Sequence, residues 1–307
     1  MKVLITGGAG FIGSHIARYF LETGHEVVVL DSLRSGRCNV DESILTRGSV
    51  TDYELVDRLM AGVRHVFHLA ALVSVPESLE KPHECVDINV QGTLNVLRAA
   101  RRHGVEKVVL SSSAAVYGDD PELPKHESMR PAPKTPYAVT KLDGEYYLAM
   151  AAAEWGVPTV SLRYFNVYGP GQDPASQYAA AVPIFVQRAR QCERITIFGD
   201  GSQTRDFIHV RDVVAANVLA ASRPDLTGVY NVARGESLTI LELARKIVAL
   251  MGSSSEIVHG PERPGDIRHS LADVTRLRQS GFAPSVGLDE GLRETLDWMR
   301  RAASEPG

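Results

Sequence analysis

Short runs of apolar, often β-branched residues alternate with stretches of helical periodicity through the first half of the chain. The apolar runs predict strands at Lys2–Thr6, Glu26–Asp31, His65–Leu69, Lys107–Ser111 and Thr159–Arg163. The stretches between them predict helices near residues 11–23, 52–60, 90–103 and 137–155. This alternation is typical of a parallel sheet with helices on both faces. Right-handed crossovers would make it an α/β, Rossmann-like doubly wound sheet.

The alternation loosens after residue 165, where we expect a domain boundary. A loop rich in glycine and proline at 169–174 and a turn at 199–201 follow. Further on, Thr239 and Glu242 have the spacing of a capping box ahead of an apolar helix at about 239–251. We therefore predict a first domain at 1–165, rejoined by segments near 205–232, and a smaller C-terminal α/β domain at 166–307 that binds the substrate.

The composition is that of an ordinary globular chain with a small-molecule partner. Of the 307 residues, 44% are hydrophobic and 23% charged, and the formal net charge of −4 provides no basic field for nucleic acid. Cys38, Cys85 and Cys192 form no CxxC pair, so we expect neither a disulfide framework nor a metal site. The N-terminal apolar run is too short for a signal peptide, and no later run could span a bilayer. We expect a cytoplasmic protein that does not enter a membrane.

A glycine cluster follows the first predicted strand and opens the first predicted helix. In Gly7-Gly-Ala-Gly10-Phe-Ile-Gly13, glycine lets the backbone approach a pyrophosphate, which the free N–H groups at the start of the helix can bind. Asp31 ends the next strand about 20 residues on, where a carboxylate can accept hydrogen bonds from a ribose diol. The same charge repels a 2′-phosphate. We therefore expect NAD rather than NADP, although Arg34 and Arg37 lie nearby.

Tyr137 and Lys141 supply the candidate chemistry. Four residues apart on a helix, they share one face, where the ammonium would lower the pKa of the phenol and let it exchange protons with an alcohol. This spacing arises by chance in roughly one such chain in four, so its context has to carry the argument. Ser113 provides context, because at the carboxyl edge of the sheet its hydroxyl can bridge a substrate hydroxyl to Tyr137. Ser111 and Ser112 fit a turn at the end of a strand better than catalysis.

The GxxGxxG spacing of the glycine cluster and Tyr137-x-x-x-Lys141 together resemble the extended short-chain dehydrogenase/reductase superfamily, and the resemblance covers nearly the whole chain. It implies tightly bound NAD+, with Leu69-Ala70-Ala71 beneath the nicotinamide-side ribose and Asn89 in a central helix. Ser49 stands where the family commonly has an acid near the adenine, and a serine can still accept that hydrogen bond. The predicted cofactor-binding residues are Gly7, Gly10, Phe11, Ile12, Gly13, Asp31, Ser32, Ser49, Val50, Leu69, Ala70, Ala71, Asn89, Tyr137 and Lys141.

Ala114 and Ala115 narrow the reaction. In the nucleotide-sugar 4,6-dehydratases of this scaffold an Asp-Glu pair occupies the matching positions and eliminates water, whereas alanine has no proton to move. The remaining groups can oxidise a carbinol. The resemblance therefore implies a UDP-hexose 4-epimerase, in which hydride leaves C4, the ketone rotates and hydride returns to its other face. The predicted catalytic residues are Ser113, Tyr137 and Lys141.

Segments in the second half resemble the UDP-sugar site of the UDP-galactose 4-epimerases. Asn166 and Arg205 fall in segments that meet the diphosphate of the substrate in that family. Arg263 and Asp266 fall in a later segment, where an arginine clamps phosphate and an aspartate meets ribose. Two arginines could offset two phosphate charges through paired N–H donors.

Two further residues of this resemblance bear on the sugar. Gln172 falls in a segment resembling the UDP-N-acetylglucosamine 4-epimerase branch, where it is placed to contact the sugar. Ser270 is small where enzymes restricted to glucose and galactose have an aromatic residue, so a 2-acetamido group would fit. Val73 is bulkier than the glycine found in that branch and would narrow the pocket. The predicted substrate-binding residues are Ser113, Asn166, Gln172, Arg205, Arg263, Asp266 and Ser270.

Other functions remain open alongside epimerisation of UDP-glucose and probable N-acetylated analogues. One is a UDP-glucuronate 4-epimerase, because nothing in the sequence excludes a carboxylate at C6. Another is a net NAD-dependent nucleotide-sugar dehydrogenase or reductase, which would exchange its nicotinamide in each turnover. A third is a protein that binds NAD without catalysis. Since the family often dimerises through the helix at 137–155 and the one before it, we also expect a homodimer.

Overall fold

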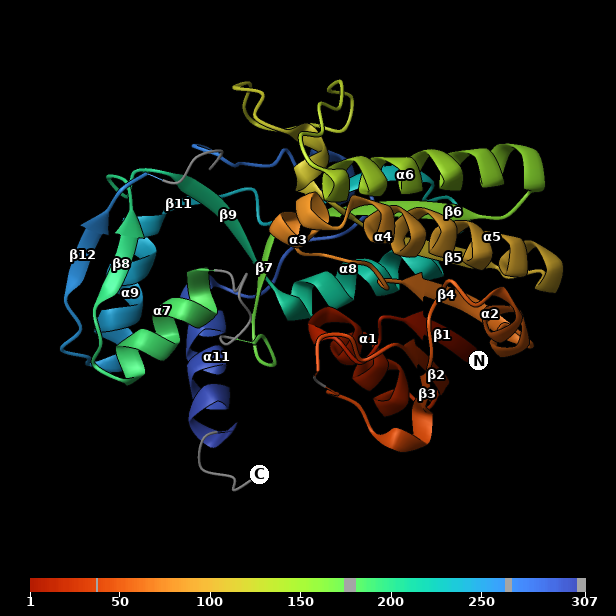
Figure 1. Cartoon of the computed structure of the whole chain (residues 1–307), viewed down its shortest axis with the longest axis horizontal. Helices are drawn as coiled ribbons and strands as arrows, with labels where there is room; N and C mark the ends of the chain where they lie inside the picture. The colour runs from red at the N-terminus through yellow and green to blue at the C-terminus, as the bar shows by residue number, and fades with distance from the viewer. Residues whose placement is uncertain (37, 174–180, 263–266, 303–307) are drawn as a thin grey trace.

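A seven-stranded parallel sheet forms the larger part of the molecule in a computed structural model that describes residues 1–36, 38–173, 181–262 and 267–302 (Figure 1). The strand order is β10-β6-β5-β4-β1-β2-β3, so the chain reverses its direction of winding between β1 and β4. This order confirms the predicted doubly wound α/β class. The strands are β1 (Lys2–Thr6), β2 (Glu26–Asp31), β3 (Leu45–Arg47), β4 (Val63–His68), β5 (Lys107–Ser113), β6 (Thr159–Tyr164) and β10 (Gly228–Val232).

Several strands differ from their prediction: β4 begins two residues earlier and ends one residue earlier than predicted, and β6 ends one residue later. The sequence analysis missed β3, because three residues are too few to show a period of two. β5 runs two residues further than predicted, because Ser111, Ser112 and Ser113 pair in register with Leu162, Arg163 and Tyr164 of β6. A polar serine run does not look like a strand in isolation. The neighbouring strand supplies the hydrogen bonds that make it one.

Helices cover both faces of this sheet, and alternate strand residues point to the two layers. Val3 and Ile5 of β1 belong to an apolar cluster with helices α1 (Phe11–Glu22) and α8 (Val210–Ser222). Leu4 belongs to the opposite cluster, with α2 (Tyr53–Leu59), α5 (Gly92–His103) and α6 (Pro136–Trp155). This period of two buries both faces of the sheet. The carboxyl ends of the strands remain open between the layers.

The smaller part is built on a three-stranded sheet of order β11-β9-β7 and a two-stranded sheet of β8 and β12. Helices α7, α9 and α11 cover them and form a separate apolar cluster (Figure 1). The predicted capping box is confirmed, because the Thr239 hydroxyl accepts from Glu242 N–H while the Glu242 carboxylate accepts from Thr239 N–H. The elements are β7 (Asn166–Tyr168), α7 (Ala181–Arg190), β8 (Ile195–Phe198), β9 (Thr204–His209), β11 (Ser237–Thr239), α9 (Ile240–Met251), β12 (Ile257–Gly260) and α11 (Leu288–Ala302).

The chain passes between the two parts several times. After β9, helix α8 and strand β10 return to the large sheet, and α10 (Thr275–Gln279) then packs on β10. Leu277 and Phe282 accordingly belong to the apolar cluster of the large sheet, although they follow residue 165 by more than a hundred positions. A division at residue 165 stays a prediction. Among the helices that the structure describes, none is long and apolar enough to cross a membrane.

Candidate active site

The carboxyl ends of the large sheet open into a cleft of about 910 Å³. Its lining comes from β1, β2, β4, β5 and β6, from the start of α6, and from the segment after β7. Ligands of open α/β sheets bind at this edge, where the strand order reverses. The predicted residues that line the cleft are Gly7, Gly10, Phe11, Ile12, Gly13, Asp31, Ser32, Ser49, Val50, Leu69, Ala70, Ala71, Ser113, Tyr137, Lys141 and Gln172.

The glycine cluster forms a close contact between β1, β4 and α1. A Cβ on Gly7, whose φ is +70°, would lie 2.6 Å from the Ala70 nitrogen, and a Cβ on Gly13 would lie 2.4 Å from the Gly7 carbonyl oxygen. Only glycine fits at these two positions. Helix α1 follows with Gly10 as its N-cap and no capping side chain, so its first N–H groups remain available to an anion. These features fit the pyrophosphate of a dinucleotide.

Asp31 connects the glycine cluster to the segment after β2. Its Oδ2 accepts a hydrogen bond from Ala9 N–H at 3.0 Å, and its Oδ1 accepts one from Leu33 N–H at 2.8 Å. Each carboxylate oxygen keeps a second acceptor site, and the side chain lines the cleft. The residue can therefore hold these two loops and accept bonds from a ribose diol at the same time.

Tyr137 and Lys141 lie on the first two turns of α6, opposite the end of β5. Thr135 caps the helix by accepting from Ala138 N–H at 3.3 Å, which places Tyr137 in the first turn. The Lys141 ammonium donates to the Ser111 carbonyl at 2.7 Å and lies 5.8 Å from the centre of the Tyr137 ring. Ser113, at the end of β5, lies close enough to the phenol to affect its pKa. We call this group of β5, β6 and α6 the catalytic floor.

The pKa of Tyr137 moves in the direction opposite to the prediction. Burial raises the pKa of this phenol, and the nearby Ser113 opposes the rise only in part. Burial also lowers the pKa of Lys141 to about 8. The predicted lowering of this pKa by Lys141 was therefore wrong. Helical spacing predicts that the two groups share one face. It does not predict their burial, which removes hydrating water and shifts both pKa values.

A buried ion pair, which the sequence analysis missed, lies beneath the catalytic residues. Glu145 follows Lys141 by one helical turn, and both its side chain and that of Arg163 on β6 are 3% exposed. Arg163 donates to the two carboxylate oxygens at 2.8 and 2.7 Å, and Ser112 on β5 donates to one of them. Since Ser112 and Arg163 are neighbours across β5 and β6, Glu145 ties α6 to both strands. The spacing of Tyr137, Lys141 and Glu145 could have signalled this third residue.

The Asn89 side chain forms hydrogen bonds within the protein and does not line the cleft. Its amide oxygen accepts from Leu72 N–H at 2.7 Å, and its amide nitrogen donates to the Leu72 carbonyl at 3.2 Å and to the Thr140 hydroxyl at 2.9 Å. The side chain is 4% exposed and lies in a π-helical turn at Asp87–Gln91. The predicted cofactor contact is corrected to a positioning role, because these bonds link the loop after β4 to α6.

Asn166, Arg205 and Ser270, which were predicted to meet the diphosphate or the sugar, lie in or beside the three-stranded sheet. Asn166 on β7 donates to the Asp206 carbonyl at 3.2 Å, and Ser270 N–H donates to the Thr204 carbonyl at 3.1 Å. Arg205 lies between these two contacts on β9. We call β7, β9 and residues 267–272 the substrate wall. Arg37, Arg263 and Asp266 lie outside the described residues.

Asp206 anchors this wall through a second buried carboxylate. It is 0% exposed and accepts from the backbone N–H groups of Arg234 at 2.9 Å, Gly235 at 3.0 Å and Ala272 at 3.2 Å. Burial raises the pKa of Asp206 to about 6, although these three bonds favour the charged form. The sequence analysis did not single out Asp206.

Gln172 stands where the wall meets the cleft. Its amide nitrogen donates to the Val167 carbonyl at 3.3 Å, whereas its amide oxygen is buried and has no hydrogen-bond partner among the described residues. A buried acceptor without a partner is costly, so this oxygen fits a donor group of a ligand. The preceding residue but one, Pro170, accepts a hydrogen bond from His15 of α1 at 2.7 Å. That bond joins the segment after β7 to helix α1.

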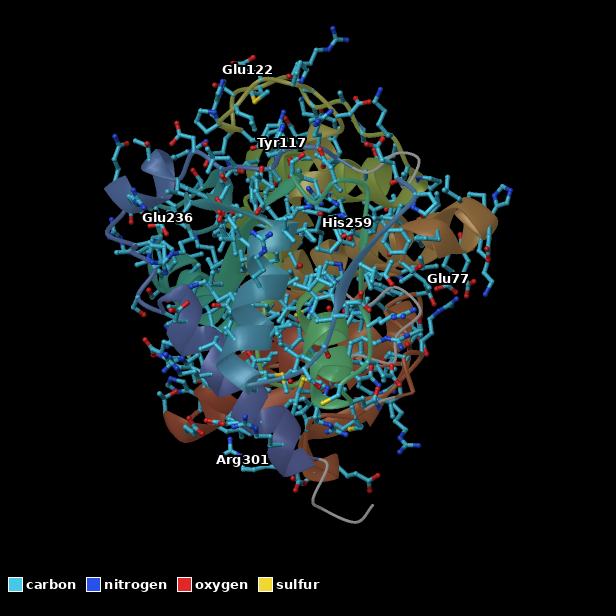
Figure 2. The ribbon with its side chains drawn as sticks, turned by 90° about the vertical axis from the view of Figure 1, so that its left-hand side faces the viewer. Glu77, Tyr117, Glu122, Glu236, His259 and Arg301 are labelled. Carbon is cyan, nitrogen blue, oxygen red and sulfur yellow. The ribbon has the colours of Figure 1, made fainter. Side chains whose placement is uncertain are left out.

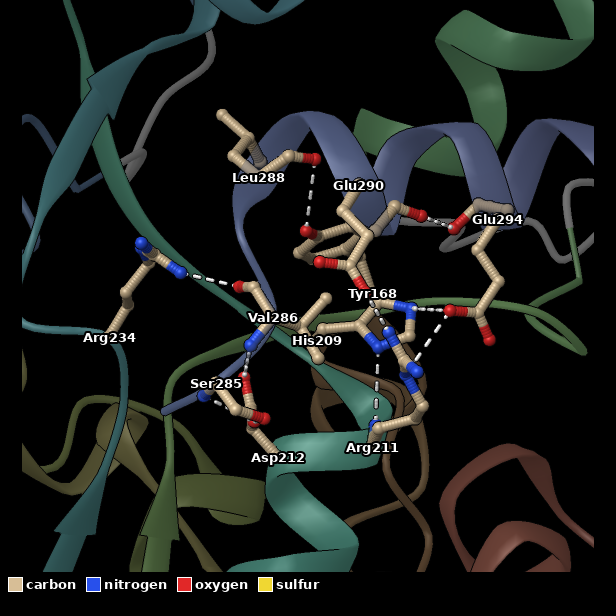
Figure 3. Close-up of polar contacts among 12 residues, drawn as sticks. Tyr168, His209, Arg211, Asp212, Arg234, Ser285, Val286, Leu288, Glu290 and Glu294 are labelled. Carbon is tan, nitrogen blue, oxygen red and sulfur yellow. Dashed lines mark hydrogen bonds and ion pairs between the residues drawn. The ribbon is translucent and has the colours of Figure 1, made fainter. Parts of the chain in front are cut away.

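Helix α11 supports the same segment from behind (Figure 3). The Tyr168 hydroxyl donates to the Leu288 carbonyl at 3.4 Å, and the His209 ring packs edge-on against Tyr168. A Cβ on Gly291 would lie 2.3 Å from the Tyr168 hydroxyl, so only glycine lets the helix approach this closely. Arg211, in the first turn of α8, also forms ion pairs with Glu290 and Glu294 of α11. Burial lowers the pKa of His209 to about 4, which keeps the imidazole neutral in this contact.

Known proteins that share this sequence pattern act on nucleotide sugars. A sequence model of the NAD dependent epimerase/dehydratase family matches residues 3–233. A UDP-glucose 4-epimerase of Mycolicibacterium smegmatis is 39% identical over 98% of this chain and 99% of its own. The structure of the Thermotoga maritima UDP-glucose 4-epimerase with UDP-glucose has a TM-score of 0.95 and 37% identity, covering 99% of this chain and 100% of that one. The UDP-N-acetylglucosamine 4-epimerase of Methanobrevibacter ruminantium, in complex with UDP-N-acetylmuramic acid, has a TM-score of 0.94 and 39% identity, covering 98% of each chain.

Proposed function

This chain belongs to the NAD dependent epimerase/dehydratase family, and we propose that it is a UDP-hexose 4-epimerase that retains NAD+ through its catalytic cycle. One observation carries the proposal. Ser113, Tyr137 and Lys141 line the same cleft as the glycine cluster and Asp31, so a proton-transfer group and a dinucleotide site adjoin each other. This arrangement suits oxidation and reduction at a single carbinol.

Ala114 and Ala115 favour epimerisation over the dehydration that also occurs in the family. They form the start of a 3-10 turn, Ala114–Tyr117, directly after Ser113. Elimination of water from a hexose needs an acid and a base besides the group that serves the hydroxyl. Methyl side chains at both positions can supply neither. The activity that these residues support is therefore epimerisation, which removes no water from the sugar.

The residues of the catalytic floor divide the work of moving one proton. Tyr137 accepts the proton of the 4′-hydroxyl as the C4–H bond breaks, while Ser113 holds the oxygen within hydrogen-bond range. After the ketone has rotated, hydride adds to its opposite face and Tyr137 returns the proton. Lys141, with a pKa of about 8, is mostly charged at neutral pH and stabilises the phenolate that forms.

Bound NAD+ supplies the hydride acceptor and a positive charge close to the phenol. That charge explains how a phenol whose pKa burial raises could work as a base. Asp31, the glycine cluster and the start of α1 would hold the two nucleotide halves. Because the cofactor regains its starting state in each cycle, the enzyme has no need to release it.

We propose that the enzyme accepts both UDP-glucose and UDP-N-acetylglucosamine. Ser270 is half-buried in the substrate wall, and a serine there leaves space that an aromatic ring would fill. The unpartnered oxygen of Gln172 can accept a hydrogen bond from a sugar hydroxyl or an amide N–H. Val73 lines the cleft but is 65% exposed, so its side chain can turn toward solvent. The relatives from Thermotoga and Methanobrevibacter are named for these two kinds of sugar.

We also propose that the protein is a homodimer. Val139 and Tyr146 lie seven residues apart on one side of α6 and are 42% and 60% exposed. Val86, at the end of α4 (Pro82–Val86), is 47% exposed. Light scattering with size-exclusion chromatography tests this assembly. A dimer that Tyr146→Glu converts to a monomer is the expected result, and a monomeric parent protein would contradict it.

A panel of UDP-sugars, assayed by product separation without added NAD, tests the reaction and the substrate together. We expect UDP-glucose and UDP-N-acetylglucosamine to give their C4 epimers, and one NAD+ per chain to appear when the protein is denatured. Strict dependence on added nicotinamide would instead indicate a net dehydrogenase or reductase. Turnover of UDP-glucuronate alone would identify that substrate. Negligible kcat/KM for the acetylated sugar would exclude only the broader specificity.

A further inference from the structure

A three-residue ion-pair bridge spans the cofactor end of the cleft. Arg34, in the segment after β2, donates to the Glu77 carboxylate at 2.6 Å and makes two hydrogen bonds to the Glu84 carboxylate. Glu77 belongs to α3 (Val75–Glu80) and Glu84 to α4, so the bridge joins three elements. Glu77 lies at the edge of the molecule in the side view (Figure 2). Lys81 adds a bond to Glu77 at 3.2 Å.

The bridge starts next to the proposed ribose site. Asp31, Ser32 and Arg34 belong to one short segment at the end of β2. All three line the cleft, as does Glu77. The segment is held in place, because Leu33 adopts a left-handed φ of 54° while its N–H donates to Asp31. Arg34 is therefore close to the group expected to accept hydrogen bonds from the ribose.

An arginine in this place has a known chemical consequence. In dinucleotide-binding folds, an acid after the second strand binds the 2′-hydroxyl of NAD, and a nearby arginine accommodates the 2′-phosphate of NADP. A free Arg34 would therefore offset the repulsion from Asp31. In this structure both terminal nitrogens of the Arg34 guanidinium already donate to carboxylates. Two carboxylates thus offset the charge of Arg34, so little of that charge is left to attract a further anion.

We propose that Glu77 and Glu84 determine the preference for NAD over NADP by withholding Arg34 from the 2′ position of the adenosine ribose. The proposal rests on the use of a nicotinamide dinucleotide set out above. It assigns a specificity role to two acids that lie more than forty residues from Asp31 in sequence. Hydrogen bonds from Arg34 lower the pKa of both carboxyls, so both acids stay charged at neutral pH.

Competition between the two nucleotides tests the assignment. The full chain is incubated with equimolar NAD and NADP until the bound fraction is constant, freed of unbound nucleotide, denatured and analysed by chromatography. We expect Glu77→Gln/Glu84→Gln to bind at least ~10-fold more NADP relative to NAD than the parent chain, because the released guanidinium could then pair with a phosphate. Adding Arg34→Ala should return the ratio to that of the parent chain.

Two further variants separate this role from a stabilising surface contact. Glu106→Gln breaks a matched two-bond pair with Arg64, at 2.6 and 2.7 Å, and neither residue lines the cleft. It should leave the nucleotide ratio unchanged. Arg34→Ala alone should also change the ratio less than twofold, because the parent chain already withholds this arginine.

Several results would overturn the assignment. They are an unchanged ratio in the double variant, a gain in NADP that survives the loss of Arg34, or a large loss of NADP binding in Arg34→Ala alone. Because the assay measures binding without turnover, it stands apart from the proposed reaction. A parent chain that binds NAD without epimerising any sugar would contradict the proposed function and leave this inference intact.

Discussion

The catalytic floor and the substrate wall each contain a buried carboxylate, but the two carboxylates have different partners. In the floor, Glu145 accepts from a guanidinium and a hydroxyl. In the wall, Asp206 accepts from three backbone N–H groups. Arg163 brings a full opposite charge to Glu145, whereas the three N–H groups at Asp206 bring only partial charges. The floor therefore contains an electrostatically balanced anchor, whereas the anchor of the wall changes its charge near pH 6.

This difference matches the tasks of the two regions. Proton transfer between Tyr137 and a hydroxyl needs atoms fixed within a fraction of an ångström, and Glu145 fixes α6 against β5 and β6. The wall has to admit and release a nucleotide sugar. Its residues are held mainly by main-chain bonds between short strands and loops, such as that from Ser270 to Thr204. The comparison suggests that stability is concentrated under the chemistry and adaptability beside the substrate.

Replacement of Glu145, the buried carboxylate of the catalytic floor, should have the largest effect on stability. Glu145→Ala leaves Arg163 buried without its counter-charge, so we expect a loss of about 3–5 kcal/mol in the free energy of unfolding, measured with denaturant. Glu106→Ala, which breaks the exposed pair with Arg64, should have a far smaller effect. Equal losses in the two variants would contradict the assignment of Glu145 as an anchor.

Removal of the proton acceptor should leave the fold intact and abolish turnover. We expect Tyr137→Phe to lower kcat at least ~100-fold, because a general base contributes that much, with bound NAD+ unchanged. Tyr19→Phe is the matched control, since Tyr19 lies on α1, is 37% exposed and does not line the cleft. Activity within tenfold of the parent enzyme in Tyr137→Phe would show that another group takes the proton.

A fall in pH should stabilise the parent chain against unfolding relative to the Asp206→Asn variant. The pKa of Asp206 is raised in the folded state to about 6, so the folded protein binds a proton there before the unfolded chain does. The carboxyl therefore adds stability below its unfolded pKa, and this stability is lost as the pH rises through about 6. Between pH 7.5 and 4.5 we expect the parent chain to gain about 2 kcal/mol relative to Asp206→Asn. Denaturant unfolding at both pH values measures the difference, and parallel curves would contradict it.

Removal of the hydrogen bond between His15 of α1 and the Pro170 carbonyl should have the smallest effect. The Pro170 carbonyl can only accept, so His15 must carry its proton on Nε2, and burial lowers the pKa of this imidazole. We expect His15→Leu to raise KM for the UDP-sugar about fivefold with little change in kcat, the cost of about one hydrogen bond. His15→Gln, which keeps an N–H donor, should recover most of the loss. Equal KM values for the two variants would show that the bond does not position the segment.

Local patterns predicted much of the cofactor half. The glycine cluster, Asp31 and Tyr137-x-x-x-Lys141 depend on contacts within one strand, one turn or one helix, and the sequence displays those spacings directly. Sixteen of the predicted residues consequently line one cleft. The family resemblance placed Asn166, Arg205 and Ser270, but the structure puts them on the adjoining wall. Asn89 was misjudged because an amide that binds a ligand and one that binds backbone look the same in sequence.

The sequence alone thus determined the class of fold and displayed the dinucleotide motif and the candidate proton-transfer pair, because short-range geometry governs each of them. Only the tertiary structure decided how those groups are charged and anchored. Burial, which raises the pKa of Tyr137, and the pairing of Glu145 with Arg163 depend on what the other strands and helices bring near. The capture of Arg34 by Glu77 and Glu84 likewise joins three separate elements. Desolvation and long-range charge pairing have no period along a chain, so no local pattern records them.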